Sequence, residues 1–161
     1  MQVEMRIQGL MCDPITRMPI VLLRDPVSDA KLPIWVGVFE ASAISLELEH
    51  VEPPRPMTHD LLRETIRRLG ARLSRVVITD LQDNTFFAEL EVEAPSGTLR
   101  IDARPSDAIA LALRCEAPIF AEQKVIADAQ NIDLTRGHED SERYRAWLEE
   151  LDRKDLGKYE M

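Results

Sequence analysis

The hydrophobic and polar positions of the first 36 residues predict β-strands. Between Val3 and Gln8 every second side chain is apolar, as expected of a strand with one buried face. Two short apolar runs follow at residues 18–24 and 32–36, and both are bounded by turn residues such as Asp25 and Pro26. Their spacing predicts antiparallel neighbours.

After Gly37 the apolar spacing becomes that of a helix. From Val38 to Val51, apolar residues recur at intervals of three and four, and the prolines at residues 53–56 are expected to end this helix. A second helix is predicted from Thr58 to a stop at Gly70. Its predicted apolar residues are Leu61, Leu62, Ile66 and Leu69.

The second half of the chain returns to strands. Three are predicted, at residues 73–81, 86–92 and 98–103, with turns at 82–85 and 96–97. A third helix follows at about Pro105 to Arg114, and a short helical turn is predicted at 122–129. The expected fold class is therefore α+β, with a mostly antiparallel sheet or sheets packed by about three helices.

The last thirty residues differ from the rest of the chain. We expect a domain over residues 1–130 and, over 131–161, a linker and a charged C-terminal helix at about 139–156. Tyr144 and Trp147 share one face of that helix. Two interpretations stay open: a solvated terminal helix that docks one narrow stripe, or a helix that binds a protein partner through these two aromatic anchors.

Composition limits the classes of function. The formal net charge is −9, so the protein as a whole repels nucleic acid, and any contact with a phosphate backbone must come from a local basic site. No apolar stretch approaches the roughly 18 residues of a membrane span, and the N-terminus lacks an export signal, which predicts a cytoplasmic protein without membrane contact. Cys12 and Cys115 stand apart from other metal ligands, and we expect them to be buried apolar residues.

Two motifs repeat one design at predicted helix starts. Residues 55–60 and 104–107 each combine Arg-Pro, a hydroxyl side chain and an aspartate, just before an apolar run. Helix capping and the helix dipole alone explain the hydroxyl and acidic residues. They do not explain Arg55 and Arg104, because a positive charge is disfavoured at a helix N-terminus.

An arginine beside free backbone N–H groups can bind a phosphate. The candidate phosphate-binding residues are therefore Arg55, Thr58, Arg104 and Ser106. An Arg–Asp ion pair across the two motifs, with no ligand, explains the pattern equally well.

Acid–base and metal chemistry have candidates in the same segments. With Asp60 or Asp107 beside it, His59 could transfer a proton in phosphodiester cleavage; the simpler alternative is a solvated histidine. Glu40 and Asp102 interrupt apolar stretches and are candidate ligands for a divalent cation such as Mg²⁺ or Mn²⁺. A dipole-stabilising Glu40 and an arginine-paired Asp102 fit the same spacings.

Three blocks of this sequence resemble the bifunctional nuclease domain. They are residues 32–44, 54–61 and 102–112, which occur in the family's order, and the resemblance covers about residues 1–127. It implies a compact α+β fold, a homo-oligomer and, from plant members, cleavage of both RNA and DNA. The positions that match the family pattern are Glu40, Arg55, Thr58, His59, Asp60, Asp102, Arg104, Ser106 and Asp107. Many bacterial relatives continue into a UvrB/UvrC-like interaction motif, whereas this chain has the charged segment from Glu139.

The leading functional expectation is a nuclease that cleaves phosphodiester bonds of RNA or DNA with a divalent metal. The alternative is a non-catalytic regulatory or assembly module that binds a phosphorylated ligand or a protein partner. The acidic charge and the lack of a basic stripe favour the module, and the resemblance favours the nuclease.

Overall fold

The computed structural model describes residues 1–132 and also residues 146, 147, 149 and 150, which are helical. Most of the predicted linker and C-terminal helix, Tyr144 included, lies outside the described residues. Asn131 and Ile132, which we had placed in the linker, are instead the last residues of a helix.

Seven strands form one sheet in the order β3-β2-β1-β7-β4-β5-β6. Every neighbouring pair is antiparallel except β4 and β7, which are parallel, so the prediction of a mostly antiparallel sheet is confirmed. The strands are β1 (Gln2–Cys12), β2 (Pro19–Arg24), β3 (Lys31–Trp35), β4 (Arg72–Gln82), β5 (Thr85–Ala94), β6 (Gly97–Ala103) and β7 (Ile119–Glu122).

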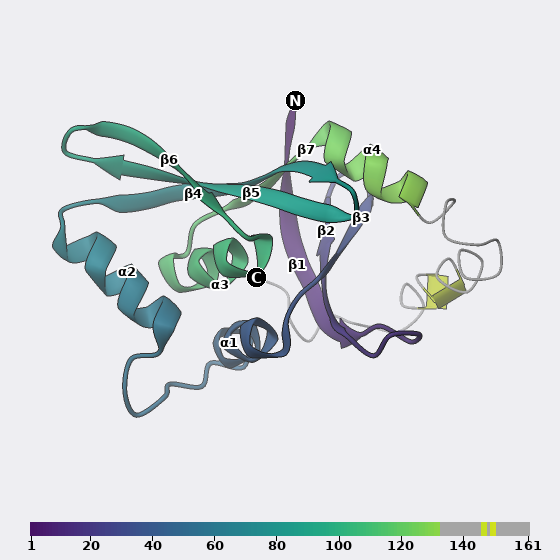
Figure 1. The fold of residues 1–161 in the computed structure, drawn as a ribbon, viewed down its shortest axis with the longest axis horizontal. Helices are drawn as coiled ribbons and strands as arrows, with labels where there is room; N and C mark the ends of the chain where they lie inside the picture. The colour runs from purple at the N-terminus through teal and green to yellow at the C-terminus, as the bar shows by residue number, and fades with distance from the viewer. Residues whose placement is uncertain (133–145, 148, 151–161) are drawn as a thin grey trace.

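Four helices accompany the sheet among the described residues: α1 (Val38–Leu48), α2 (Thr58–Arg68), α3 (Pro105–Cys115) and α4 (Gln123–Ile132). Helix α3 packs on β4 and β5, and α1 and α2 pack on α3. Helix α4 contacts β3 and β4, which are not neighbours in the sheet, and Figure 1 shows it at the opposite end of the molecule from α2. None of the described helices is long and apolar enough to cross a membrane.

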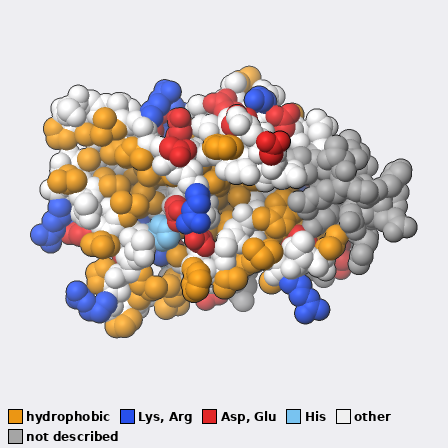
Figure 2. Space-filling view, in the orientation of Figure 1, with side chains coloured by type: hydrophobic (Ala, Val, Ile, Leu, Met, Phe, Trp, Pro, Cys, Tyr) orange, Lys and Arg blue, Asp and Glu red, His pale blue; other side chains and the backbone are white. Residues whose placement is uncertain are grey.

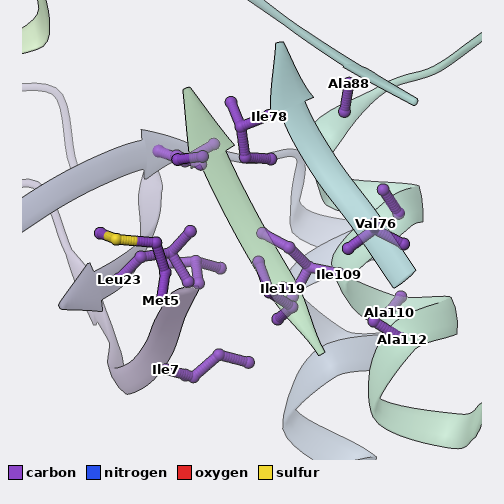
Figure 3. Packing of buried hydrophobic residues seen from close by; sticks show 14 of the residues in the cluster. Met5, Ile7, Leu23, Val76, Ile78, Ala88, Ile109, Ala110, Ala112 and Ile119 are labelled. Carbon is purple, nitrogen blue, oxygen red and sulfur yellow. The ribbon is translucent and has the colours of Figure 1, made fainter. Parts of the chain in front are cut away.

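Helix α3 is buried because it is apolar almost all round. Eight of its eleven residues are buried, and three of these are the alanines at 108, 110 and 112. Their small side chains let α3 lie close to the sheet, where Ile109 meets Val76 and Ile119 (Figure 3). Helices α1 and α2 pack on α3 and also reach the sheet, where α1 contacts β2 and α2 contacts β4.

Helix α1 is shorter than the sequence pattern predicts. It ends at Leu48, because His50 adopts a left-handed backbone conformation with φ of 54° and its N–H bonds back to the Glu47 carbonyl. Val51, which we had placed on the buried face, is exposed, and so is Val38 at the start of the helix.

Only part of the predicted apolar face of α2 is buried. Ile66 packs against the core, but Leu61 and, just after the helix, Leu69 are exposed by 61% and 72%. His59 is the one residue of α2 that is fully buried, because α2 turns its first turn toward α3, where specific bonds add to the apolar packing of Ile66. The prediction for the cysteines is also wrong in part, since Cys12 is exposed and Cys115 is only half-buried.

Candidate functional site

Four side chains from three helices form a continuous chain of hydrogen bonds. His59 Nε2 lies 2.9 Å from Asp107 Oδ1, and Arg104 Nε donates to Asp107 Oδ2 at 2.9 Å. Arg104 Nη2 donates to Glu40 Oε1 at 2.8 Å. The order is therefore His59–Asp107–Arg104–Glu40, and it joins the two sequence motifs through a histidine and an aspartate instead of the predicted Arg–Asp pair.

Each member is held at the start of a helix. Arg104 is the N-cap of α3, Asp107 lies in the first turn of α3, His59 in that of α2 and Glu40 in that of α1. Gly37 leaves room for the glutamate, because a Cβ at this position would lie 2.3 Å from Glu40 Oε2. The bonds from Glu40 and Asp107 raise the pKa of Arg104 above its usual value, so this arginine stays charged beside two carboxylates.

One nitrogen of His59 remains available. The residue is only 8% exposed, yet Nδ1 bonds to no described residue. Within the described part of the chain, the only fully buried polar side-chain atom without a hydrogen-bond partner is Gln8 Oε1, so His59 Nδ1 keeps contact with solvent. Figure 2 shows histidine atoms beside basic and acidic side chains near the middle of this face, with hydrophobic side chains around them. An oriented histidine with one open nitrogen can accept or donate a proton.

Asp60 was expected beside His59 as part of the proton transfer, but its side-chain partner is Arg114. Its Oδ1 accepts from Arg114 Nε at 2.8 Å and its Oδ2 from the Met57 N–H at 2.9 Å. Burial of Asp60 favours its neutral form, but Met57 and Arg114 together favour the charged form more strongly, so the pKa of Asp60 lies below its usual value. These contacts favour a structural role for Asp60, and its catalytic role stays a prediction.

Arg114 is the residue that sequence reasoning missed. Its side chain is 2% exposed and donates to Asp60 on α2, to the Ala43 carbonyl on α1 and to the Ala110 carbonyl on α3. It therefore ties together the three helices that carry the candidate site. An arginine in the last turn of a helix is usually a surface residue that complements the dipole, so its position gave no signal of burial.

The candidate phosphate-binding residues are placed differently from one another. Ser106, next to Asp107 in the chain, is only 7% exposed. Its hydroxyl bonds to no described residue. Thr58 is exposed and is not the helix cap, since the N-cap of α2 is Met57. Arg55 is exposed and lines a hollow of about 360 Å³ with Asp60 and Arg63. Arg104 is linked to His59 through Asp107, and no such link reaches Arg55.

Among the described residues, the two candidate metal ligands are not grouped with other side chains that could bind a metal ion. Glu40 is bonded to Arg104, and Asp102 is exposed on β6 opposite Glu89. In the residues that the structure describes, no group of three or more His, Cys, Asp or Glu side chains is arranged to hold a metal ion. The alternative pair between Asp102 and an arginine is not formed with Arg104, which binds Glu40 and Asp107 instead.

A family model of the bifunctional nuclease domain matches residues 21–133. The match begins within β2, runs past α4 and includes every residue of the His59–Asp107–Arg104–Glu40 chain. The chain belongs to the bifunctional nuclease domain family. The match covers all three sequence blocks, so the family resemblance is confirmed.

Relatives of this bifunctional nuclease domain occur in bacteria and plants. An uncharacterized protein of Mycobacterium tuberculosis is 46% identical over 126 residues, which are 78% of this chain and 75% of that protein. "Bifunctional nuclease 1" of Oryza sativa is 29% identical over 66% of this chain, and "Bifunctional nuclease 2" of Arabidopsis thaliana is 30% identical over 62%. The matched part is only 33% and 31% of the length of these two plant proteins.

Proposed function

We propose that this protein is a nuclease that hydrolyses phosphodiester bonds of RNA, DNA or both. The observation that carries the proposal is the His59–Asp107–Arg104–Glu40 chain, which sets a proton-transfer group and a fixed positive charge beside the N-terminus of α3. The names of the plant relatives support the same class of reaction. A site of this kind has what phosphodiester hydrolysis needs: a base or acid, and positive groups for the phosphate.

The proposed reaction uses the open atoms of the site. Arg104 is 66% exposed, and its Nη1 bonds to no described residue, so this N–H pair is free to bind a phosphate oxygen with the help of the Ser106 hydroxyl. A water molecule attacks phosphorus, the bond from phosphorus to the leaving oxygen breaks, and His59 Nδ1 takes the proton of the water. Asp107 orients the imidazole by accepting from Nε2, and the proton then passes to the leaving oxygen or to solvent.

We also propose that the reaction is assisted by a divalent cation, Mg²⁺ or Mn²⁺, and the assay below tests this. The carboxylates of Glu40 and Asp107 are both engaged by Arg104, so they do not offer a prepared set of ligands. We therefore assign no step of the reaction to a metal ion.

The first test is a cleavage assay with single-stranded RNA and DNA in Mg²⁺, Mn²⁺ or EDTA. We expect activity to co-elute with the wild-type protein and to fall about 10²- to 10⁴-fold in His59→Ala, because the proton-transfer group is lost. The variant must melt near the wild-type temperature for the comparison to hold. Equal activity in the wild type and in His59→Ala would point to a contaminating nuclease and refute the proposal.

The module hypothesis is the second candidate, and one observation favours it. The four side chains of the site are hydrogen-bonded to one another, as they would be in a structural clamp between helices. A non-catalytic module that binds a phosphorylated ligand predicts a higher melting temperature with phosphate or a nucleotide, and no turnover. Cleavage that depends on His59 would exclude it.

We also propose that two copies of this chain associate through β6. This strand is a sheet edge, and Leu99 and Ile101 lie beside the buried Val92 and Leu90 of β5, yet they are 47% and 44% exposed. The face that continues the core is thus open at this edge. An antiparallel pair of β6 strands centred on Ile101 sets Arg100 opposite Asp102 of the second copy, which is a self-complementary arrangement.

Light scattering at micromolar concentration tests this association. We expect a dimer that dissociates in Ile101→Lys, because two like charges then face each other at the axis. Leu69→Lys, just after α2, adds the same charge at another exposed apolar position and is the control. Arg100→Asp is expected to weaken the dimer, and adding Asp102→Arg is expected to restore it. A monomeric wild type, or a dimer that survives Ile101→Lys, would contradict the proposal.

A further inference from the structure

A hollow of about 490 Å³ lies between α2, the end of α3 and the start of β4, and its lining is unusually basic. Four of its nine lining residues are arginines, and a single one is a carboxylate. The lining residues are Arg63, Glu64, Ile66, Arg67, Ala71, Arg72, Leu73, Arg114 and Cys115. We call this hollow the arginine groove.

The groove reverses the charge of the protein locally. With the adjacent Arg68, five arginines meet three carboxylate partners, which are Glu64, Glu93 and Asp60. The surplus is two positive charges in a chain whose net charge is −9. The bonds from Arg67 and Arg68 lower the pKa of Glu64 to about 2, so Glu64 is charged at neutral pH and is rightly counted as a negative charge.

Many N–H groups of these arginines remain open. A guanidinium has five N–H donors, and Arg67 uses Nε and Nη2 for Glu64, which leaves Nη1. Arg63 makes one long contact of 3.4 Å with the Arg114 carbonyl and no ion pair with a described carboxylate. Arg67 and Arg72 are 70% and 72% exposed, so solvent or a ligand reaches them.

Two arginines of the groove share a helical face with His59. His59, Arg63 and Arg67 are separated by four residues each on α2, which places them on one face about 6 Å apart along the helix axis. The bonds of His59 to Asp107 and of Arg63 to the Arg114 carbonyl confirm that this face is turned toward α3.

We propose that the arginine groove binds the phosphate backbone of a single nucleic-acid strand and directs it along α2 toward His59. Arginine forks bind phosphate oxygens well, and the groove also offers the apolar Ile66 and Ala71 for sugars and bases. The direction toward His59 rests on the proposed nuclease function, whereas binding in the groove does not require cleavage. The groove supplies the local basic site that an acidic protein needs for this contact.

Fluorescence anisotropy with a labelled single-stranded oligonucleotide tests the groove. Phosphorothioate linkages keep the probe from being hydrolysed. We expect Arg63→Ala and Arg67→Ala each to weaken binding roughly 3- to 10-fold, and to lower the slope of log K against log salt by about 0.7. Glu64→Gln is expected to tighten binding, because it removes the one carboxylate of the groove without changing its shape.

Arg6→Ala is the matched control. Arg6 is exposed on β1, so the substitution changes the net charge equally but does not touch the groove. We expect binding within twofold of the wild type. The assignment of the groove would be overturned if Arg6→Ala weakened oligonucleotide binding as much as the groove variants do. It would also be overturned if Glu64→Gln bound the oligonucleotide more weakly than the wild type. An unlabelled acidic peptide is also tested as a competitor. If it displaces the probe as strongly as unlabelled oligonucleotide does, the ligand is a protein, and the assignment of nucleic acid is overturned.

The outcomes separate this inference from the nuclease proposal. If the strand binds in the groove but no cleavage depends on His59, the groove stands and the nuclease fails. If cleavage depends on His59 but Arg63→Ala and Arg67→Ala bind as the wild type, the nuclease stands and the groove is refuted.

Discussion

Replacing Arg114 with methionine is expected to lower the free energy of unfolding by about 3–5 kcal/mol, because it leaves the charge of Asp60 without its buried partner. The bonds to the Ala43 and Ala110 carbonyls are lost as well. For a chain of this size the melting temperature should fall by roughly 10 °C. Urea unfolding, followed by circular dichroism, measures the difference directly.

Two control variants separate charge from packing. Arg68→Met removes an arginine that is 75% exposed, and should change stability by less than about 0.5 kcal/mol. Adding Asp60→Leu to Arg114→Met should recover much of the loss, because neither charge is then left alone. A loss under 1 kcal/mol in Arg114→Met would show that Arg114 does not hold the three helices together.

The Asp60–Arg114 pair also predicts how stability depends on pH. The pKa of Asp60 is lower in the folded protein than in the unfolded chain, so the pair stabilises the fold above the unfolded value, near pH 4. That stabilisation is lost as the pH falls through the folded value. The difference in unfolding free energy between the wild type and Asp60→Asn should therefore shrink below about pH 4. A constant difference from pH 7 to pH 3 would contradict the assignment.

Local patterns predicted most elements of the fold. The alternation in β4 and β5 and the turn between them are matched by the structure, where Asp83 and Asn84 both adopt the left-handed conformation that a tight hairpin needs. Strand β7 was missed, because a run of four residues carries little periodicity. It is nevertheless the strand that joins the two halves of the sheet, and its parallel partner β4 lies about forty residues earlier in the chain.

The sequence pointed to all four members of the candidate site and to Asp107 as one of two possible partners of His59, but not to their other contacts. Arg104 and Asp107 are three residues apart at one helix start, and they do pair. His59 meets Asp107 across 48 residues and Glu40 meets Arg104 across 64, so both contacts depend on how the helices pack. The same limit explains α2. Its spacing predicts an apolar buried face, of which Ile66 does pack against the core. Bonds of His59 and Asp60 to α3 turn the first turn of the helix inward, and the leucines stay exposed.

Asp107→Asn is expected to lower kcat for nucleic-acid cleavage by about 10²- to 10⁴-fold. The carboxylate accepts from His59 Nε2, so it keeps the proton on that nitrogen and leaves Nδ1 free as a base. An amide can donate to Nε2 instead, which moves the proton to Nδ1 and removes the base. Arg104 keeps its bond to Glu40, so the positive charge stays in place. Asp83→Asn in the β4–β5 turn makes the same chemical change on the surface and should leave kcat unaltered.

The kinetics of the two residues together distinguish catalysis from simple support of the fold. If Asp107 acts through His59, then His59→Ala, Asp107→Asn and the double variant should all lose similar activity, because the second change removes nothing that the first has left. Imidazole added to His59→Ala should restore part of the activity when Asp107 is intact. The limb of the pH–rate profile that belongs to the histidine should vanish in both single variants. Losses that add in the double variant, with the profile unchanged, would mean that the pair only joins α2 to α3.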